Sequence, residues 1–347
     1  MKTDTPTALL NPQVAAGAPR QRPWKALILL AVLSVLISLP LVSKNFFVFQ
    51  LTLAMVYAMA ILGLNLLTGF NGQFSLGHGA FYAVGAYTAA ILMDHGGVWY
   101  VWTIPAAGII CFVAGFLFGL PALRLEGTYL ALATFALAIA MPQILKVSPI
   151  EHWTGGVQGI VIMKPDAPFG LPINQDQWLY YFTLIVLILM FIWAYNLVGS
   201  RTGRAMKAIR DNPTAAKAMG VNLSLYKSLT FGVSALYVGV AGALSAIVVQ
   251  FVAPDSFTFA LSVILFVGLV VGGVGWIPGA FFGALFILFV PHFAEGISKG
   301  LAGAVYGVML ILLIFVMPSG AAGLLKLLYD RFAIVRRLLE GLSGRKQ

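Results

Sequence analysis

The residues that could do chemistry in this chain are few and scattered. Of its 347 residues, one is cysteine and four are histidine, namely His78, His95, His152 and His292. No histidine pairs with another or with an acidic residue at a metal-ligand spacing, and no G-x-x-x-x-G-K-[ST], G-x-S-x-G or H-E-x-x-H motif is present. The sequence therefore predicts no catalytic centre and no ATP, metal or other cofactor bound by this chain itself.

A cluster of polar residues interrupts one long apolar stretch. Residues 45–93 contain no charged residue before Asp94, yet the segment 68–72 has a turn-forming composition. Irregular backbone at membrane depth is tolerated only where it is buried or lines a cavity. The polar residues around this break are therefore candidates for a solute pathway or its gate, and the alternative is that they hold neighbouring helices together. They are Asn65, Asn71, Gln73, Ser75 and His78.

Composition indicates that the surrounding elements lie in a membrane. Hydrophobic residues make up 60% of the chain and charged residues 9%, with a mean hydropathy of +0.95, whereas a soluble domain has about 25% charged residues. Most of the basic residues fall in three clusters beside apolar runs, at 20–25, 201–227 and 326–346. This distribution follows the positive-inside rule, and the absence of a basic groove with interleaved aromatic residues argues against nucleic-acid binding.

Ten apolar segments could cross a bilayer, which requires about 20 residues of helix. Two long stretches are each divided into two spans, at 68–72 and at 272–279, because glycine and proline favour turns there. The expected fold is an all-α, polytopic bundle of about ten spans, or of eight or nine if 74–93 or 278–293 is re-entrant. The predicted spans are 26–43, 46–67, 74–93, 100–121, 128–147, 178–199, 228–250, 257–274, 278–293 and 300–317.

Charge placement also predicts the orientation of the spans. With the basic N-terminus in the cytoplasm, ten crossings put the loop 201–222 and the C-terminus there as well. The loop 148–177 then lies outside, in the periplasm, and holds one lysine against three acidic residues.

The expected domains are a disordered cytoplasmic tail over 1–25, a transmembrane domain over 26–325, and a basic cytoplasmic tail over 326–347. The segment 26–43 is expected to be an uncleaved span rather than a signal peptide, because it follows a long leader and no small-x-small cleavage site precedes Lys44.

The cytoplasmic loop 201–222 is predicted to form two short helices. Helix formers over 204–210 put basic residues on one face and apolar residues on the other. Asn212 followed by Pro213 is typical of the start of a second helix, and Gly220 of the position after a helix end. The alternative is an amphipathic segment lying on the anionic leaflet.

Several motifs occur in a fixed order along the chain. They are Leu64-Asn65-Leu66-Leu67-x-Gly69-x-x-Gly72-Gln73-x-Ser75-Leu76-Gly77-His78-Gly79-Ala80-Phe81, Leu123-Arg124-Leu125-x-Gly127-x-Tyr129-Leu130-Ala131, Thr154-Gly155-Gly156-x-x-Gly159-Ile160, Gly203-Arg204 with Arg210-Asp211, Ala215-Ala216-x-x-x-Gly220, Pro254-Asp255-Ser256-Phe257-x-x-x-x-Ser262 and Gly272-Gly273-x-Gly275. Together they resemble the branched-chain amino acid permeases of ABC importers, specifically the LIV M-type subunit, over about 46–325.

This resemblance implies that 201–222 is a coupling loop that docks into an ATPase subunit. Thr214 stands where such loops often carry an acidic residue, so the resemblance does not extend to a salt bridge at that position. The implied coupling residues are Gly203, Arg204, Arg210, Asp211, Ala215, Ala216 and Gly220. In the outer loop, the candidates for docking a binding protein are Thr154, Gly155 and Gly156, and an ordinary outer loop is the alternative.

The implied function is uptake of branched-chain amino acids, or of related amino acids, amides, urea or aromatic acids, across the bacterial inner membrane. The implied partners are two ABC ATPase subunits that bind ATP and Mg²⁺, an H-type permease and a periplasmic substrate-binding protein. A transporter or channel acting alone would usually need ion ligands within its spans, and a membrane enzyme would need a catalytic set. The sequence shows neither, so we expect a transport subunit rather than an enzyme.

Overall fold

The computed structural model describes residues 34, 36–122, 127–168, 173–297, 302–316 and 320–323. Residues 1–43 and 44–347 form two separate units, and the elements discussed below belong to the second. The predicted tails over 1–25 and 326–347 lie outside the described residues, as does half of the predicted first span over 26–43.

The second unit consists mainly of apolar helices joined by short loops. Two short strands, β1 (Ile160–Val161) and β2 (Phe251–Val252), pair antiparallel. They depart from the all-α expectation because two extended loop segments meet there and satisfy each other's backbone groups. The helices are α2 (Asn45–Asn65), the π-helix η1 (Leu66–Phe70), α3 (His78–Asp94), α4 (Tyr100–Ala122), α5 (Thr128–Ile144), α6 (Ser148–Thr154), α7 (Gln175–Gly199), α8 (Arg201–Asp211), α9 (Pro213–Ala218), α10 (Leu223–Val249), the 3₁₀ helix η3 (Pro254–Phe257), α11 (Phe259–Gly272), α12 (Gly279–Ile297) and α13 (Ala302–Val316).

Helix α10 lies at the core of the unit and packs against α4, α3 and α2. Glycines let these helices approach to backbone contact. A Cβ added at Gly85 of α3 would overlap the carbonyl oxygen of Gly239, and one added at Gly242 would overlap that of Tyr82. Such small-residue contacts are typical of membrane bundles, because close dispersion contacts rather than the hydrophobic effect hold helices together in lipid.

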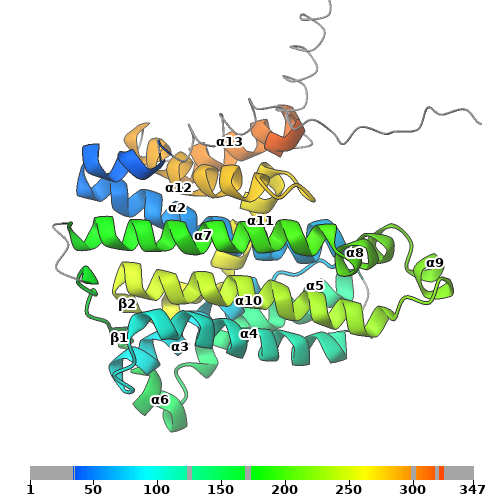
Figure 1. The fold of residues 1–347 in the computed structure, drawn as a ribbon, viewed down its shortest axis with the longest axis horizontal. Coiled ribbons are helices and arrows are strands. Elements are labelled where there is room, and N and C mark those ends of the chain that lie inside the picture. The colour runs from blue at the N-terminus through cyan, green and yellow to red at the C-terminus, as the bar shows by residue number, and fades with distance from the viewer. Residues whose placement is uncertain are drawn as a thin grey trace, which may run out of the picture. The chain divides into compact units, whose positions relative to one another are not determined.

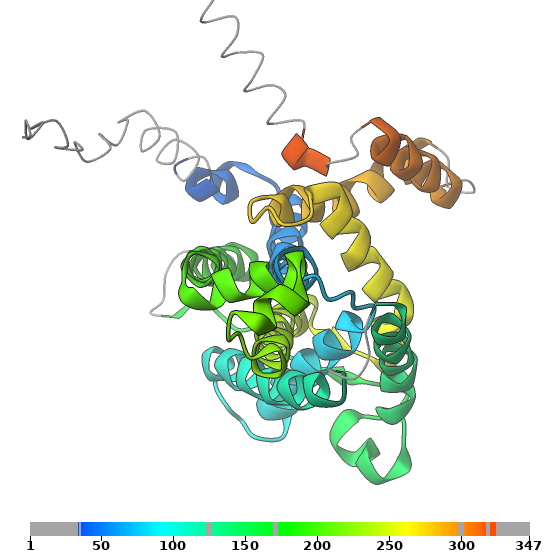
Figure 2. The same cartoon turned by 90° about the vertical axis from the view of Figure 1, so that its right-hand side faces the viewer.

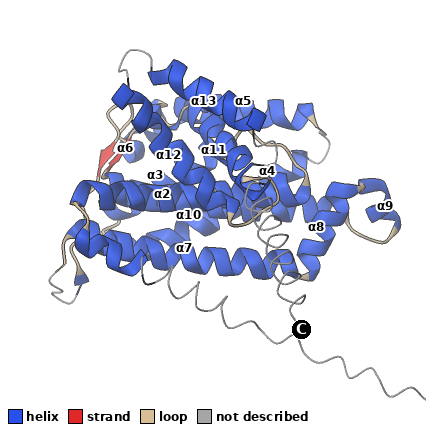
Figure 3. Ribbon diagram, turned by 90° about the horizontal axis from the view of Figure 1, so that it is seen from above, coloured by secondary structure: helices blue, strands red, loops and turns tan. Residues whose placement is uncertain are grey.

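The helices have two distinct ends. Figures 1 and 3 show α9 at one end of the long helices and α6 with the β1–β2 pair at the other. We call these the α9 end and the strand end. Figure 2 looks along the bundle from the α9 end, where α11 (yellow) runs between α12 and α5, both of which it contacts.

The multi-pass helical architecture is confirmed, but the count of ten spans remains a prediction. Helices occupy the nine predicted ranges from 46–67 onward. Among the described residues, α2 with η1, α4, α7, α10 and α12 are long and apolar enough to cross a membrane, and α5 with α6 forms a pair bent by 79°. Helix α11 has 14 residues. It rises only about 21 Å, whereas the hydrocarbon core is about 30 Å thick.

Both predicted interruptions of the apolar stretches are confirmed. The first consists of η1 and the segment 71–77, which separate α2 from α3. The second is the turn 273–278 between α11 and α12, in which Gly273 and Gly275 have φ angles of +110° and +78°. Residues with a Cβ rarely adopt these angles, so glycine is what permits the turn.

Candidate functional site

The loop 201–222 forms two helices at the α9 end, as its sequence predicts. The side-chain oxygen of Asn212 accepts a hydrogen bond from the amide of Ala215 at 3.0 Å, and Pro213 occupies the first turn of α9. Gly220 follows the helix with a φ angle of +85°. The capping residues therefore divide the loop at the predicted position.

Helix α8 is amphipathic, and its apolar face is fixed on the bundle. The Ser200 hydroxyl begins the helix by accepting a hydrogen bond from the Gly203 amide at 3.4 Å. Gly203 lies so close to the end of α7 that an added Cβ would overlap the carbonyl oxygen of Val198. Met206 and Ile209 are 1% and 2% exposed. We therefore expect α8 to move with the end of α7 rather than independently of it.

The rest of the loop is exposed. Arg204 lies on the outer face of α8, where it donates to the carbonyl oxygen at the end of α7. In and after α9, Ala216 is buried, whereas Ala215 and Gly220 are exposed and Met219 exposes 85% of its surface. A surface cavity of about 450 Å³ lies beside α9 at the start of α10. This part of the loop is accessible to a second protein.

The basic face of α8 contacts the first break in the spans. The Arg210 guanidinium donates to the carbonyl oxygen of Gly69 in η1, with an Nη1–O distance of 2.9 Å, and its Nη2 lies 2.9 Å from the Asp211 carboxylate. The Lys207 ammonium lies 5.7 Å from the centre of the Phe70 ring. π-Helical segments are frequent at functional sites, and here one is hydrogen-bonded to the loop.

The two breaks also contact each other. The Asn65 side chain donates to the carbonyl oxygen of Trp276 at 2.9 Å and accepts from the amide of Gly275 at 2.8 Å. A Cβ added at Gly69 would lie 2.5 Å from that amide nitrogen. We call the contact among η1, the turn 273–278 and α8 the junction. The junction brings together two breaks and a loop. The sequence predicted each of these three features but not the contact among them.

Two of the five candidate pathway residues belong to a chain of hydrogen bonds between helices. Ser234 of α10 donates to the carbonyl oxygen of Gly63 at 2.6 Å, so its oxygen accepts from His78 Nε2 at 2.7 Å. The Ser75 hydroxyl then donates to His78 Nδ1 at 2.8 Å. This is the assignment in which every proton has an acceptor. Ser75 and His78 thus connect α2, α3 and α10, in keeping with the packing interpretation.

Gln73 and Asn71 differ sharply in their environments. Gln73 donates to the carbonyl oxygen of Lys227 at 3.2 Å, which connects the first break to the start of α10. Asn71 is 2% exposed, yet neither its side-chain oxygen nor its nitrogen has a hydrogen-bond partner. It borders a cavity whose wall includes Arg210 and Lys227. Buried polar groups are rarely left unpaired, so Asn71 stands apart from the other four candidates, whose side chains are hydrogen-bonded.

The candidate docking residues form a tight turn at the strand end. Thr154 is buried, and its hydroxyl donates to the carbonyl oxygen of Leu145 at 2.8 Å. Gly155 has a φ angle of +68°, and Gly156 has one of +56°. Three exposed apolar side chains follow this turn, and the sequence analysis did not single them out; we call them the apolar strip. Its members are Val157, Val161 and Met163, which are 65%, 73% and 90% exposed.

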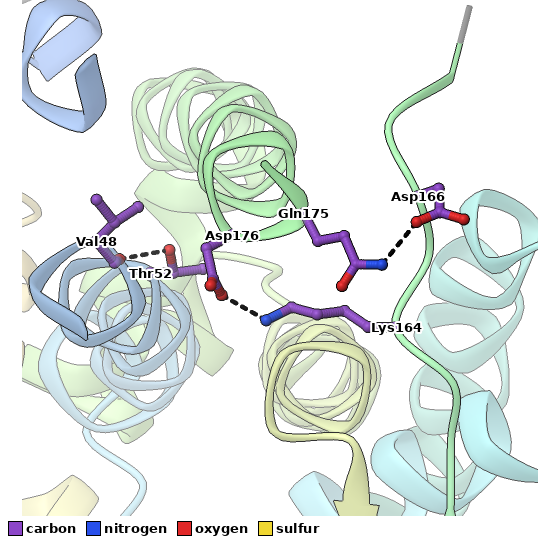
Figure 4. A network of polar contacts seen from close by, with 6 residues as sticks. All are labelled: Val48, Thr52, Lys164, Asp166, Gln175 and Asp176. Carbon is purple, nitrogen blue, oxygen red and sulfur yellow. Dashed lines mark hydrogen bonds and ion pairs between the residues drawn. The ribbon is translucent and has the colours of Figure 1, made fainter. Parts of the chain in front are cut away.

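Polar contacts connect the segment after β1 to the start of α7. The Lys164 ammonium pairs with the Asp176 carboxylate in the first turn of α7, and Gln175 donates to Asp166 at 2.6 Å (Figure 4). The Thr52 hydroxyl in the same view donates within α2. Acidic residues in the first turn complement the helix dipole, so these contacts fix where the loop meets the helix.

The fold and the junction define a multi-pass helical membrane subunit with a projecting two-helix loop. Among the described residues, no group of three or more His, Cys, Asp or Glu side chains could hold a metal ion. Sequence comparison gives the family: the chain belongs to the branched-chain amino acid transport system / permease component family, whose model matches residues 46–316.

Individual relatives support this assignment. The chain is 34% identical over 272 residues to the high-affinity branched-chain amino acid transport system permease protein LivM of Salmonella typhimurium, covering 72% of this chain and 64% of LivM. It is 26% identical over 297 residues to the LivH permease protein of Escherichia coli, covering 78% and 92%. The match thus spans less than two thirds of the length of LivM. No solved structure matches the chain.

Proposed function

We propose that this chain is the membrane subunit of an ABC importer that carries branched-chain amino acids, or related amino acids, amides, urea or aromatic acids, across the bacterial inner membrane. Family membership and the names of the relatives support the proposal. One structural observation carries it: the hydrogen bond from Arg210 to Gly69 joins an exposed loop to a break in the spans. A loop connected in this way can transmit the movement of a partner into the membrane domain.

Each end of the helical unit is assigned to a different partner protein. The α9 end faces the cytoplasm, where two ATPase subunits bind ATP and Mg²⁺ and contact α9 through exposed residues such as Ala215 and Met219. The strand end faces the periplasm, where a substrate-binding protein docks on the apolar strip of Val157, Val161 and Met163. An H-type permease supplies the second half of the membrane domain, and its similarity to this chain supports a pseudosymmetric pair.

The mechanism begins with the movement of α9 by the ATPases. Because α8 packs tightly against the end of α7, it moves as a rigid body rather than bending. Arg210 moves with α8 and displaces the Gly69 carbonyl to which it is bonded, and Asn65 passes that displacement to the turn 273–278. Both breaks therefore shift together, which opens the pathway on one side of the membrane and closes it on the other.

The test is transport by the purified complex in proteoliposomes, with the cognate binding protein presenting labelled leucine, isoleucine or valine. We expect ATP-dependent uptake and a matching stimulation of ATP hydrolysis. Ala215→Arg enlarges an exposed side chain and should abolish both, whereas Lys44→Met, also at an exposed position, should not change either.

Two results would revise the proposal in different ways. Uptake without any ATPase subunit would show a transporter that acts alone, and the ABC assignment would be rejected. ATP-coupled uptake of another solute would retain the mechanism and change only the substrate.

A further inference from the structure

A short segment between α10 and α11 covers a cavity at the strand end. It consists of β2, Ala253 and η3, and we call residues 251–257 the strap. Val252 is 1% exposed and Phe257 is 6% exposed, so the strap packs onto the bundle rather than projecting from it. The strap forms one wall of a cavity of about 170 Å³, whose other walls come from α2, α3, α10 and α11. A displacement of the strap would therefore widen the access to this cavity.

The strap is attached to the outer loop, which carries the apolar strip. Strands β1 and β2 pair antiparallel, so that Val161 of the strip lies opposite Phe251 of the strap (Figure 1). The two segments are also in close backbone contact, because a Cβ added at Gly159 would overlap the carbonyl oxygen of Val252. A protein that docks on the strip and displaces the outer loop must therefore displace the strap as well.

Two contacts hold the strap on the bundle. The Lys146 ammonium, just after α5, lies 2.5 Å from the Asp255 carboxylate in η3. The Phe257 ring packs against α3, with its centre 6.1 Å from that of Tyr82 and 6.0 Å from that of Tyr87. The Asp255 side chain is 67% exposed, so it remains in water when the ion pair breaks. Exposed ion pairs contribute little free energy, and this one can therefore open and close reversibly.

The residue at which the strap begins is held in an unfavourable conformation. Gln250 ends α10 with a φ angle of +66°, and no other non-glycine residue in the described part of the chain has a positive φ. Residues with a Cβ disfavour this region. The Gln250 amide donates to Ala246 of α10 at 2.9 Å, whereas its carbonyl oxygen accepts from the Ile162 amide of the outer loop at 2.8 Å. The outer loop thus helps to impose the conformation, and moving the loop would release it.

We propose that the strap is a conformational switch that carries the docking of a binding protein into the membrane domain. Docking on the apolar strip lifts the strap through the β1–β2 pair, separates Lys146 from Asp255 and lets Gln250 leave its positive φ angle. The strap continues directly into α11, and α11 ends at the turn 273–278 of the junction. Lifting the strap therefore displaces α11 against the junction. This inference rests on the proposed transport function and gives a role to the motif Pro254-Asp255-Ser256-Phe257.

The test measures how fast a cysteine beneath the strap is labelled, in the complex reconstituted into nanodiscs without ATP. Ser245 of α10 lines the cavity and is partly buried, so Ser245→Cys provides the reporter. A positively charged methanethiosulfonate reagent reacts with it when the strap is lifted, so the labelling rate follows the population of the lifted state. The native Cys111 is buried, and its labelling, measured separately by mass spectrometry, reveals any variant that unfolds.

The ion pair and the strained residue predict opposite changes in the basal labelling rate. Asp255→Ala should speed labelling about two- to fivefold, and the reciprocal pair Lys146→Asp with Asp255→Lys should restore the original rate. Asp166→Ala is the matched control, because Asp166 is an exposed carboxylate at the same end that bonds Gln175 rather than the strap. Gln250→Gly should slow labelling about fivefold or more, because glycine accepts a positive φ angle and stabilises the closed strap.

The binding protein supplies the decisive measurement. At saturating concentration it should speed labelling of Ser245→Cys at least about fivefold. The proposal is overturned if the binding protein docks without changing the labelling rate, if Asp255→Ala fails to speed labelling, or if Gln250→Gly fails to slow it.

The same measurements separate the switch from the transport proposal, because the labelling requires no ATP. Labelling that responds to the binding protein in a complex without ATP-driven uptake would contradict only the transport function. ATP-driven uptake that depends on the binding protein, with no change in labelling, would contradict only the switch.

Discussion

Replacing Gly69 by alanine tests how closely the two breaks in the spans meet. The added Cβ would lie 2.5 Å from the amide nitrogen and 3.0 Å from the Cα of Gly275, and it would overlap the Asn65 side-chain oxygen. Overpacking costs about 1–3 kcal/mol. Turning Asn65 away would break two hydrogen bonds of about 1 kcal/mol each. Alanine regains up to about 1 kcal/mol in helix propensity, so we expect a net loss of about 2–4 kcal/mol.

The assay is thermal unfolding of the purified protein, followed by tryptophan fluorescence, together with uptake in proteoliposomes. At roughly 2–4 °C per kcal/mol, Gly69→Ala should lower the Tm by about 4–16 °C and reduce uptake. Gly199→Ala is the matched control, because Gly199 ends α7 with no heavy atom within 4 Å of an added Cβ. If Gly69→Ala and Gly199→Ala have the same Tm and the same uptake, the close contact at the junction is refuted.

Three further predictions concern single contacts. Arg210→Met should lower ATP-driven uptake at least about tenfold, because a charged hydrogen bond worth about 1.5–3 kcal/mol links the loop to Gly69, while ATPase subunits still co-purify. Ser234→Ala should lower the free energy of unfolding by about 1–3 kcal/mol, because it leaves the buried His78 Nε2 without its partner. Val157→Asp should weaken docking of the binding protein, measured by surface plasmon resonance, with no change in Tm, because the side chain is exposed.

Each of these predictions has a result that would contradict it. Normal uptake by Arg210→Met would mean that the loop acts on the spans by another contact. Thr88→Val is the control for Ser234→Ala, since the Thr88 hydroxyl bonds only a carbonyl of its own helix, and equal Tm values would disprove the inter-helix chain. Unchanged docking by Val157→Asp would exclude the apolar strip as the docking surface.

Local sequence was sufficient to predict the breaks and the caps of the loop. Glycine-rich composition identified 68–72 and 272–279, and both interrupt helices in the structure. Asn212 and Gly220 divide the loop as predicted. These features depend on backbone preferences of a few neighbouring residues, which the sequence shows directly.

The junction could not be predicted, because it depends on tertiary contacts between distant segments. Asn65 and Trp276 are 211 positions apart, and Arg210 reaches Gly69 across 141 positions. The polar character of Asn65 left open whether it lines a pathway or holds neighbouring helices together, and in the structure both ends of its amide contact the second break. Thr154 illustrates the same limit, because its contact with the Leu145 carbonyl buries a side chain whose motif suggested an exposed loop.

Helix α10 has a consequence for the energetics of the proposed importer. It begins beside α9, runs for 27 residues through the core of the bundle, and ends next to β2. At 1.5 Å per residue it is a continuous rod of about 40 Å, so its two ends cannot respond independently. If a binding protein at the strand end tightens ATPase binding at the α9 end by some factor, thermodynamic reciprocity requires the ATPases to tighten the binding protein by the same factor. The factor by which each partner changes the other's affinity can be measured separately, and the two factors should be equal.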